Sequence, residues 1–267
     1  MSQDAVKWNV GQYSKFINER TRPAAELLGR VELETAKTVV DLGCGPGNST
    51  ALLKHRWPHA RVIGIDNSDE MLSQAKASLP DFEFQSGDIS DWHPENTFDV
   101  IFSNAALQWV PNHEQLLPRL AELINANGYF AMQVPNNHME PTHRAMRDVA
   151  GDHRWSVDLS KTRRQPPVLA PQKYYDLLRP YFETIDIWET RYFHEMDSYE
   201  AIAEWLKGTG LRPFIAQLAA TEQNQFLALF IDELRKHYDV QSDKKLLLPF
   251  PRLFIVAQRW KVLSRNQ

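Results

Sequence analysis

The chain has 267 residues, of which 43% are hydrophobic, and its formal net charge is −4. A chain of this length can bury the core of one domain with an insertion, and its single cysteine, Cys44, excludes a disulfide framework. It has no tract of lysine and arginine, no long apolar run and a polar, charged N-terminal segment. We therefore expect a cytoplasmic protein that binds neither nucleic acid nor membranes. Nothing in the composition indicates the oligomeric state.

The N-terminal half begins with a helical pattern and continues as an alternation of strands and helices. Residues 8–28 read as a helix interrupted at Pro23, so we expect a helical lid over residues 1–30. From residue 31 to Val134, short apolar runs alternate with amphipathic stretches, which is typical of a parallel sheet with crossover helices. The expected strands are Thr38–Leu42, Arg61–Ile65, Phe82–Gln85, Phe98–Ser103 and Tyr129–Val134.

Capping residues mark the helices between these strands. Asn48 or Ser49 should cap the first helix, and Ser68 should cap the second. Asn112 precedes a third helix, which we expect to run through Leu123.

The C-terminal half interrupts the alternation. Five of the sixteen prolines lie between Pro135 and Pro171, whereas Ser198 to Tyr238 reads as several helices and strands are expected at Ile185–Phe193 and Leu253–Trp260. The expected domains are a lid (1–30), a core (31–134), a cap segment and return (135–183), a core strand (184–193), a helical cap (194–246) and a final core strand (247–267). The fold class is α/β: a Rossmann-like, seven-stranded, mostly parallel, doubly wound sheet with a helical cap over its carboxyl edge, where such sheets bind ligands.

A glycine-rich turn follows the first strand, in the sequence VVDLGCGPGNST. The second strand ends in Asp66, and a carboxylate there can accept hydrogen bonds from both hydroxyls of a ribose. The pairing of this turn with this acid predicts a nucleoside cofactor. The glycines at 43, 45 and 47 are spaced GxGxG, whereas a dinucleotide-binding turn reads GxGxxG.

The GxGxG turn preceded by Asp41 resembles motif I of the class I methyltransferases, which use S-adenosylmethionine. The stretches NAALQWVP, EPTH, TGLRPF and FPRLFIVA extend the resemblance over nearly the whole chain, to members of that class that esterify trans-aconitate. The resemblance implies an S-adenosylmethionine-dependent carboxyl O-methyltransferase. Its substrate would be this tricarboxylate, and its products a monomethyl ester and S-adenosylhomocysteine.

The resemblance and the positions of the residues give a candidate cofactor site. Asp88 could accept a hydrogen bond from the adenine amino group, with Ile89 and Met71 flanking the ring, and Asn104 would lie beside the methionine end. The full cofactor-binding set is Asp41, Gly43, Gly45, Asn48, Asp66, Asn67, Met71, Asp88, Ile89 and Asn104.

No catalytic residue in the strict sense is expected, because a carboxylate is already ionised at neutral pH and needs no general base. Gln108, Trp109 and Tyr13 would only position groups near the methyl. A tricarboxylate on an acidic protein requires a local cationic cluster, for which arginine is suited. The candidates are Arg22, His143, Arg191, Lys207 and Arg212, whereas Arg252 is interpreted as structural.

Several other functions are considered. The sequence Asn104-Ala105-Ala106-Leu107 stands where enzymes that methylate amino groups carry an Asn-Pro-Pro-Tyr type tetrad, so that chemistry is unsupported. No metal site is expected, because clustered aspartate and asparagine oxygens are lacking. Three alternatives stay open: transfer to another carboxylate such as a carrier-bound acyl group, a non-catalytic S-adenosylmethionine-binding protein, and a nicotinamide-dependent oxidoreductase.

Overall fold

The computed structural model describes residues 21–162, 168–208 and 210–259. The described residues form two compact units. One unit contains residues 21–134, 170–188 and 254–259, and the other contains residues from the ranges 135–169 and 189–253.

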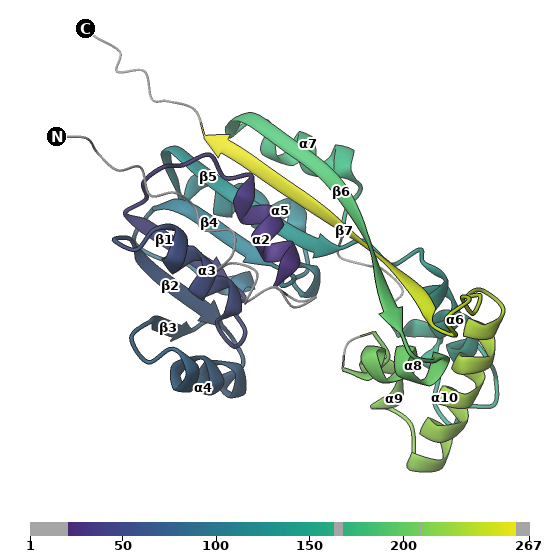
Figure 1. Ribbon diagram of the computed structural model, residues 1–267. Coiled ribbons are helices and arrows are strands. Elements are labelled where there is room, and N and C mark those ends of the chain that lie inside the picture. The colour runs from purple at the N-terminus through teal and green to yellow at the C-terminus, as the bar shows by residue number, and fades with distance from the viewer. Residues whose placement is uncertain (1–20, 163–167, 209, 260–267) are drawn as a thin grey trace, which may run out of the picture. The chain divides into compact units, whose positions relative to one another are not determined.

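A seven-stranded sheet has the order β3-β2-β1-β4-β5-β7-β6 (Figure 1). The strands are β1 (Thr38–Leu42), β2 (Arg61–Asp66), β3 (Glu83–Ser86), β4 (Phe98–Asn104), β5 (Ile124–Pro135), β6 (Phe182–Met196) and β7 (Leu246–Arg259). The pairs β1–β2, β1–β4, β2–β3 and β4–β5 are parallel, and β7 runs antiparallel. The prediction of a seven-stranded, mostly parallel, doubly wound α/β sheet is confirmed. That helices cap its carboxyl edge stays a prediction.

Helices of the first unit lie on both faces of the sheet, with α2 beside α3 on one face and α5 beside α7 on the other (Figure 1). They are α2 (Arg22–Gly29), α3 (Asn48–Arg56), α4 (Asp69–Ser78), α5 (His113–Glu122) and α7 (Pro171–Leu178), with short 3-10 turns η2 (Ile89–Asp91) and η3 (Leu107–Trp109). Pro23 stands in the first turn of α2, where its missing N–H costs no helical hydrogen bond. It therefore belongs to the start of a helix and does not interrupt α2.

The start of α3 differs from the sequence expectation. Its N-cap residue is Gly47, in the left-handed conformation with φ +91°, so the prediction that Asn48 or Ser49 caps this helix is wrong. The Ser49 hydroxyl instead donates to the carboxylate of Asp41, at 2.7 Å. Ser68 does cap α4 as predicted, because its hydroxyl accepts the N–H of Met71.

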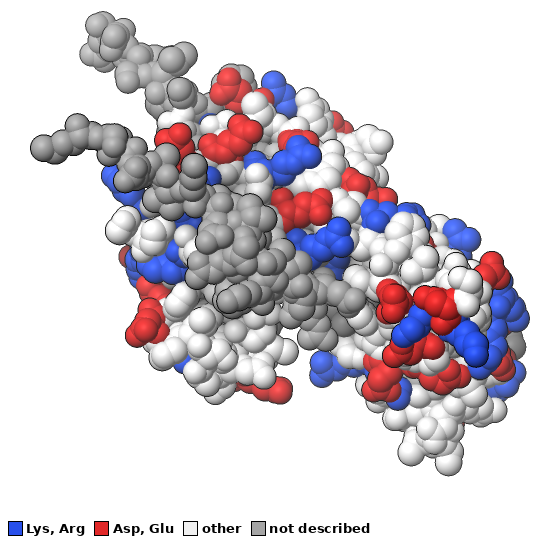
Figure 2. Space-filling model, in the orientation of Figure 1, with Lys and Arg blue, Asp and Glu red and all other residues white. Residues whose placement is uncertain are grey.

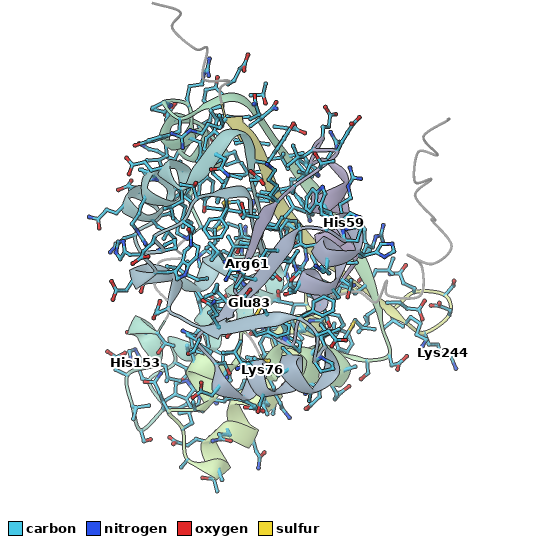
Figure 3. The ribbon with its side chains drawn as sticks, turned by 90° about the vertical axis from the view of Figure 1, so that its left-hand side faces the viewer. His59, Arg61, Lys76, Glu83, His153 and Lys244 are labelled. Carbon is cyan, nitrogen blue, oxygen red and sulfur yellow. The ribbon has the colours of Figure 1, made fainter. Side chains whose placement is uncertain are left out.

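The outer parallel strand β3 is held by an ion pair to its neighbour. Arg61 of β2 donates two hydrogen bonds, of 2.9 and 2.7 Å, to the two carboxylate oxygens of Glu83, and Figure 3 shows both residues on the adjacent strands. This two-pronged geometry raises the pKa of Arg61 and lowers the pKa of Glu83.

The second unit has its own hydrophobic core. Its helices are α6 (Pro141–Ala150), α8 (Tyr199–Lys207), α9 (Arg212–Ile215) and α10 (Ala220–Arg235), with a 3-10 turn η4 (Leu159–Lys161). α10 packs against α6 and α8, and Phe226 of α10 contacts the rings of Trp155 and Phe214 at centroid distances of 5.3 and 6.0 Å. The expectation of several helices between Ser198 and Tyr238 is confirmed.

On the face shown in Figure 2, the described lysine and arginine side chains are interspersed with aspartate and glutamate. Among the helices in the described ranges, none is long and apolar enough to cross a membrane.

Candidate functional site

A pocket of about 430 Å³ lies in the first unit, among the segments that follow the carboxyl ends of β1, β2, β3 and β4. Its volume is in the range of small-molecule sites. The pocket brings together eight of the residues predicted from the sequence: Gly43, Gly45, Asp66, Asn67, Met71, Asp88, Ile89 and Trp109. The other lining residues are Pro46, Gly87, Ser90, Ala105, Ala106, Val110 and Pro111.

The glycine turn has a backbone conformation that side chains would disrupt. Gly43, Gly45 and Gly47 all have positive φ, of +74°, +54° and +91°. A Cβ atom at Gly43 would also lie 2.1 Å from the Cβ of Ala106, another residue that lines the pocket. This position therefore needs glycine for two independent reasons, its backbone angle and the close approach of the 105–106 segment.

Asp66 is fixed by the backbone around it. Its two carboxylate oxygens accept hydrogen bonds from the N–H groups of Gly45 and Ser68, each at 2.9 Å. These bonds attach the end of β2 to the glycine turn on one side and to the start of α4 on the other. The carboxylate is held at the pocket wall with lone pairs remaining, as a ribose-binding acid requires.

Asp88 begins the turn η2 and lines the same pocket. Its Oδ1 accepts the backbone N–H of Ser90 at 2.8 Å and the Ser90 hydroxyl at 2.6 Å. These bonds lower the pKa of Asp88, and a hydrogen bond with Asn67 acts in the same direction. Asp88 therefore has two roles: it shapes the turn η2, and it presents an ionised carboxylate to the pocket.

Three buried oxygens, at the ends of β1 and β4 and in the turn η3, have no hydrogen-bond partner among the described residues: Asp41 Oδ1, Asn104 Oδ1 and Gln108 Oε1. Each belongs to a residue one or two positions from a pocket-lining residue. Asp41 is registered with Phe102, two residues before Asn104, so the two strand ends are neighbours. Buried acceptors without donors are costly, and they suit a ligand that brings its own N–H groups.

Asp41 is the most strongly perturbed of these groups. It is completely buried, and desolvation raises its pKa from 3.8 to about 6, although hydrogen bonds from the hydroxyls of Ser49 and Thr50 to Oδ2 oppose the rise. The negative charge of Asp66 adds to the rise. A carboxylate kept in such a place is typical of a functional site.

The second wall of the pocket contains backbone strain. Ala105 has φ +55°, which is uncommon for a residue with a Cβ, and its carbonyl accepts a 2.6 Å hydrogen bond from the side chain of Gln108. Trp109 follows with 53% of its surface exposed. His113 supports this wall from behind, since its ring is bonded to the Leu107 carbonyl at 2.8 Å and to the Tyr174 hydroxyl at 2.7 Å.

Three predicted cofactor-binding residues lie apart from the pocket lining in the described structure: Asp41, whose buried carboxylate is described above, Asn48 and Asn104. Asn48 is exposed at the first position of α3, and Asn104 closes β4 behind Ala105. Tyr13, predicted near the methyl, lies outside the described residues. No group of three or more histidine, cysteine, aspartate or glutamate side chains suited to a metal occurs in the described ranges.

The predicted substrate-binding cations are divided between the units. Arg22 is exposed at the start of α2 in the first unit. In the second unit, Arg191 forms two hydrogen bonds with Glu140, of 3.0 and 3.2 Å, and Lys207 forms an ion pair with Glu204 at 2.7 Å.

The other two predicted cations also belong to the second unit. The His143 ring contacts the Thr142 hydroxyl at 3.3 Å, and its Nε2 would lie 3.5 Å from a Cβ at Gly210. Arg212 is exposed at the start of α9 and makes no ion pair with another described residue.

Arg252, interpreted from the sequence as structural, is buried, and its structural interpretation stays a prediction. It is only 8% exposed, its guanidinium lies 4.9 Å from the ring centroid of Phe250, and burial lowers its pKa to about 10. His194, also buried, lies between the rings of Phe250 and Trp205, at 5.6 and 4.9 Å. One sequence signal could have indicated that Arg252 is buried, because it is a charged residue inside an otherwise apolar run, FPRLFIVA.

Comparison with known proteins agrees with this site. Residues 33–180 match the family model described as a methyltransferase domain, and the chain belongs to that family. Among its relatives, trans-aconitate 2-methyltransferase of Escherichia coli strain SE11 is 48% identical over 252 residues, which cover 94% of this chain and 98% of the relative. The enzyme of the same name from Shigella flexneri is 47% identical with the same coverage.

Solved structures agree on the fold alone. YcgJ from Bacillus subtilis superposes with a TM-score of 0.59 at 14% identity, covering 90% of this chain and 99% of that one. Phosphoethanolamine N-methyltransferase 2 of Haemonchus contortus, solved with S-adenosyl-L-methionine, gives a TM-score of 0.57 at 13% identity, covering 93% of this chain and 56% of that one.

Proposed function

We propose that this protein transfers the methyl group of S-adenosylmethionine to a carboxylate of trans-aconitate, forming a monomethyl ester and S-adenosylhomocysteine. The observation that carries the proposal is the 48% identity, over nearly the full length of both chains, with an enzyme named for this reaction. The pocket at the glycine turn supports it independently, because its acids and apolar residues are placed for an adenosyl group.

The residues present fit this cofactor. Asp66 would hold the ribose hydroxyls and Asp88 the adenine amino group, with Ile89 and Met71 against the ring. The ammonium of the methionine moiety would donate to the buried acceptors Asp41 Oδ1, Asn104 Oδ1 and Gln108 Oε1, which lack donors in the described structure. S-adenosylmethionine supplies, when bound, a methyl group activated by its attachment to a sulfonium cation.

The chain's own part in catalysis is then alignment and exclusion of water. The reaction joins a carboxylate oxygen to a methyl carbon and consumes one negative and one positive charge, so no proton has to be removed. The acceptor is ionised at neutral pH, since carboxyl pKa values lie near 4. Orienting the two reactants can lower a barrier by about 7 to 11 kcal/mol. Trp109 and the 105–106 segment form the wall that would keep water from the methyl.

Recognition of a tricarboxylate requires cations, and we propose that Arg22, His143, Arg191, Lys207 and Arg212 supply them, joined by Arg252. The buried guanidinium of Arg252 is the strongest of these candidates for a desolvated carboxylate, because arginine can form two parallel hydrogen bonds with it. Arg191 is already paired with Glu140, so its contribution would require exchange of one carboxylate for another.

A product assay tests the proposal. Purified protein incubated with S-adenosylmethionine and trans-aconitate should release S-adenosylhomocysteine and one monomethyl ester in equal amounts by mass spectrometry, with the esterified carboxyl assigned by NMR. Parallel incubations with cis-aconitate, isocitrate and an acyl carrier thioester with a free carboxyl test the acceptor. Turnover only with the thioester, or S-adenosylhomocysteine binding without turnover of any acceptor, would contradict the proposed substrate. We also place the reaction in the cytoplasm, supported by the single, buried and unpaired thiol of Cys44.

A further inference from the structure

Arg119 lies in the third turn of α5 and points its guanidinium at backbone carbonyls of another segment. Its Nη2 donates to the carbonyls of Ile89 and Ser90, at 2.9 and 3.0 Å, and its Nη1 donates to the carbonyl of Trp92. One half-buried side chain thus binds three backbone carbonyls within a four-residue segment, 89–92.

These carbonyls belong to the turn that forms one wall of the pocket. Gly87, Asp88, Ile89 and Ser90 all line it, whereas Arg119, which is bonded to this wall, is not itself a lining residue. Within the turn, Asp88 accepts from Ser90, and the Asp91 N–H donates to the Asp88 carbonyl at 3.0 Å. The turn is also bonded to the end of β2, where the Gly87 N–H donates to the Asp66 carbonyl at 3.0 Å and Asn67 forms a side-chain hydrogen bond with Asp88. The bonds from Arg119 add an attachment of the turn to the helix α5.

The helix that carries Arg119 also supports the opposite wall. α5 begins at His113, directly after the wall residues 109–111, and His113 is bonded to the Leu107 carbonyl within that wall. One rigid helix is therefore hydrogen-bonded to both walls, to one through His113 and to the other through Arg119.

We propose that Arg119 is a positioning residue that sets the adenine-side wall of the pocket before the ligand binds. The inference rests on the proposed function, because it assumes that the pocket receives an adenosyl group. A guanidinium is required because its planar fork directs N–H groups from separate nitrogens at several acceptors at once, whereas the three N–H groups of a lysine ammonium all lie on one nitrogen. Loss of the fork leaves the turn with its local bonds and its bonds to the end of β2 but detaches it from α5, so the free protein should sample other positions of Asp88 and Ile89.

The chain offers a matched control. Arg259, at the end of β7, also donates to three backbone carbonyls, those of Ala121, Glu122 and Ile124, at 2.8, 3.1 and 2.7 Å. Its acceptors lie at the C-terminal end of α5 and the start of β5, and none of them lines the pocket. Arg119→Lys and Arg259→Lys therefore remove the same chemistry from the same unit, one at the pocket and one away from it.

The test compares ligand affinity and turn mobility in both variants. For Arg119→Lys we expect the Kd of S-adenosylhomocysteine and of 5′-methylthioadenosine to rise by the same factor, on the order of ten-fold. The KM for S-adenosylmethionine should rise with them while kcat stays within two-fold. Without ligand, the amides of Ser90 and Asp91 should exchange hydrogen faster than in the parent protein. Arg259→Lys should leave both Kd values, KM, kcat and the exchange rates within two-fold of the parent.

Three results would overturn the inference: equal Kd changes in the two variants, a loss with S-adenosylhomocysteine that methylthioadenosine does not share, or an Arg119→Lys protein that is unfolded by circular dichroism. The last result would assign Arg119 to overall stability. Failure of the proposed function is separate, because it appears in the parent protein as absence of S-adenosylhomocysteine binding or of ester formation.

Discussion

Asp41 should limit the stability of the ligand-free protein, and replacing it should show this directly. The substitution Asp41→Asn keeps the size of the side chain and an oxygen that can accept from Ser49 or Thr50, and it removes only the negative charge. Because that charge is completely buried, we expect the variant to be more stable than the parent protein at neutral pH and to bind S-adenosylmethionine more weakly.

The magnitude follows from the pKa of Asp41. A rise from 3.8 to about 6 corresponds to about 3 kcal/mol by which folding disfavours the ionised form. For an acid whose pKa is raised in the folded state, the favourable contribution is fully present below pH 3.8 and is lost as the pH rises through about 6. The stability difference between variant and parent should therefore increase between these pH values and then remain constant.

The assay is urea unfolding of the ligand-free parent and Asp41→Asn proteins at intervals from pH 4 to pH 8. Between the ends of this series, the free energy of unfolding of the variant should gain up to about 3 kcal/mol relative to the parent. Calorimetry at pH 8 should show S-adenosylmethionine binding weakened about ten-fold or more, since a charge-assisted hydrogen bond is lost. A stability difference that does not change with pH would refute the assigned pKa, and unchanged affinity would refute the contact with the ligand's cation.

Three further substitutions test other parts of the structure. Gly43→Ala should abolish cofactor binding while the protein stays folded, because the added methyl meets both a positive φ and the Cβ of Ala106; a Kd within two-fold of the parent would contradict the close approach. Tyr174→Phe should cost about 1 to 3 kcal/mol of unfolding free energy, because it deprives the buried His113 of a hydrogen bond; unchanged urea midpoints would show that the bond contributes nothing. Arg212→Gln should raise the KM for trans-aconitate several-fold without changing that for S-adenosylmethionine, compared with the exposed control Arg235→Gln; equal effects on both KM values would remove Arg212 from the substrate site.

The central strands could be predicted because runs of apolar residues indicate strands that are buried in the core. Val39, Val40 and Ile101 are fully buried in β1 and β4, and the predicted ranges of these strands end within one residue of the observed ones. β5 begins earlier than predicted, at Ile124, because it includes the polar sequence INANG and a register shift against β4. Pairing with a neighbouring strand makes such a polar segment part of β5, and the residue types of the segment do not predict this pairing.

The residues of the candidate site could be predicted where their position next to a strand end, together with their residue type, indicates a ligand. The glycine turn, Asp66 and Asp88 stand at strand ends, so position and residue type together indicate a ligand. Arg119 and His113 could not be assigned in this way, because their partners include backbone carbonyls, which no residue type announces. Ser49 misled the capping prediction for a related reason. Its hydroxyl donates to the buried carboxylate of Asp41, whereas a capping hydroxyl would accept an N–H of its own helix.

The second unit is assembled from two separate stretches of chain, from the ranges 135–169 and 189–253, each entered from the first unit and left toward it. Neither unit can be obtained by a single truncation, and a recombinant version of the second would have to splice its two stretches together. The strands β1 to β4, whose carboxyl ends lead into the pocket, lie in one uninterrupted stretch of the first unit. Exchange of the two stretches between homologues would therefore leave every residue that lines the pocket unchanged, because all of them lie between Gly43 and Pro111.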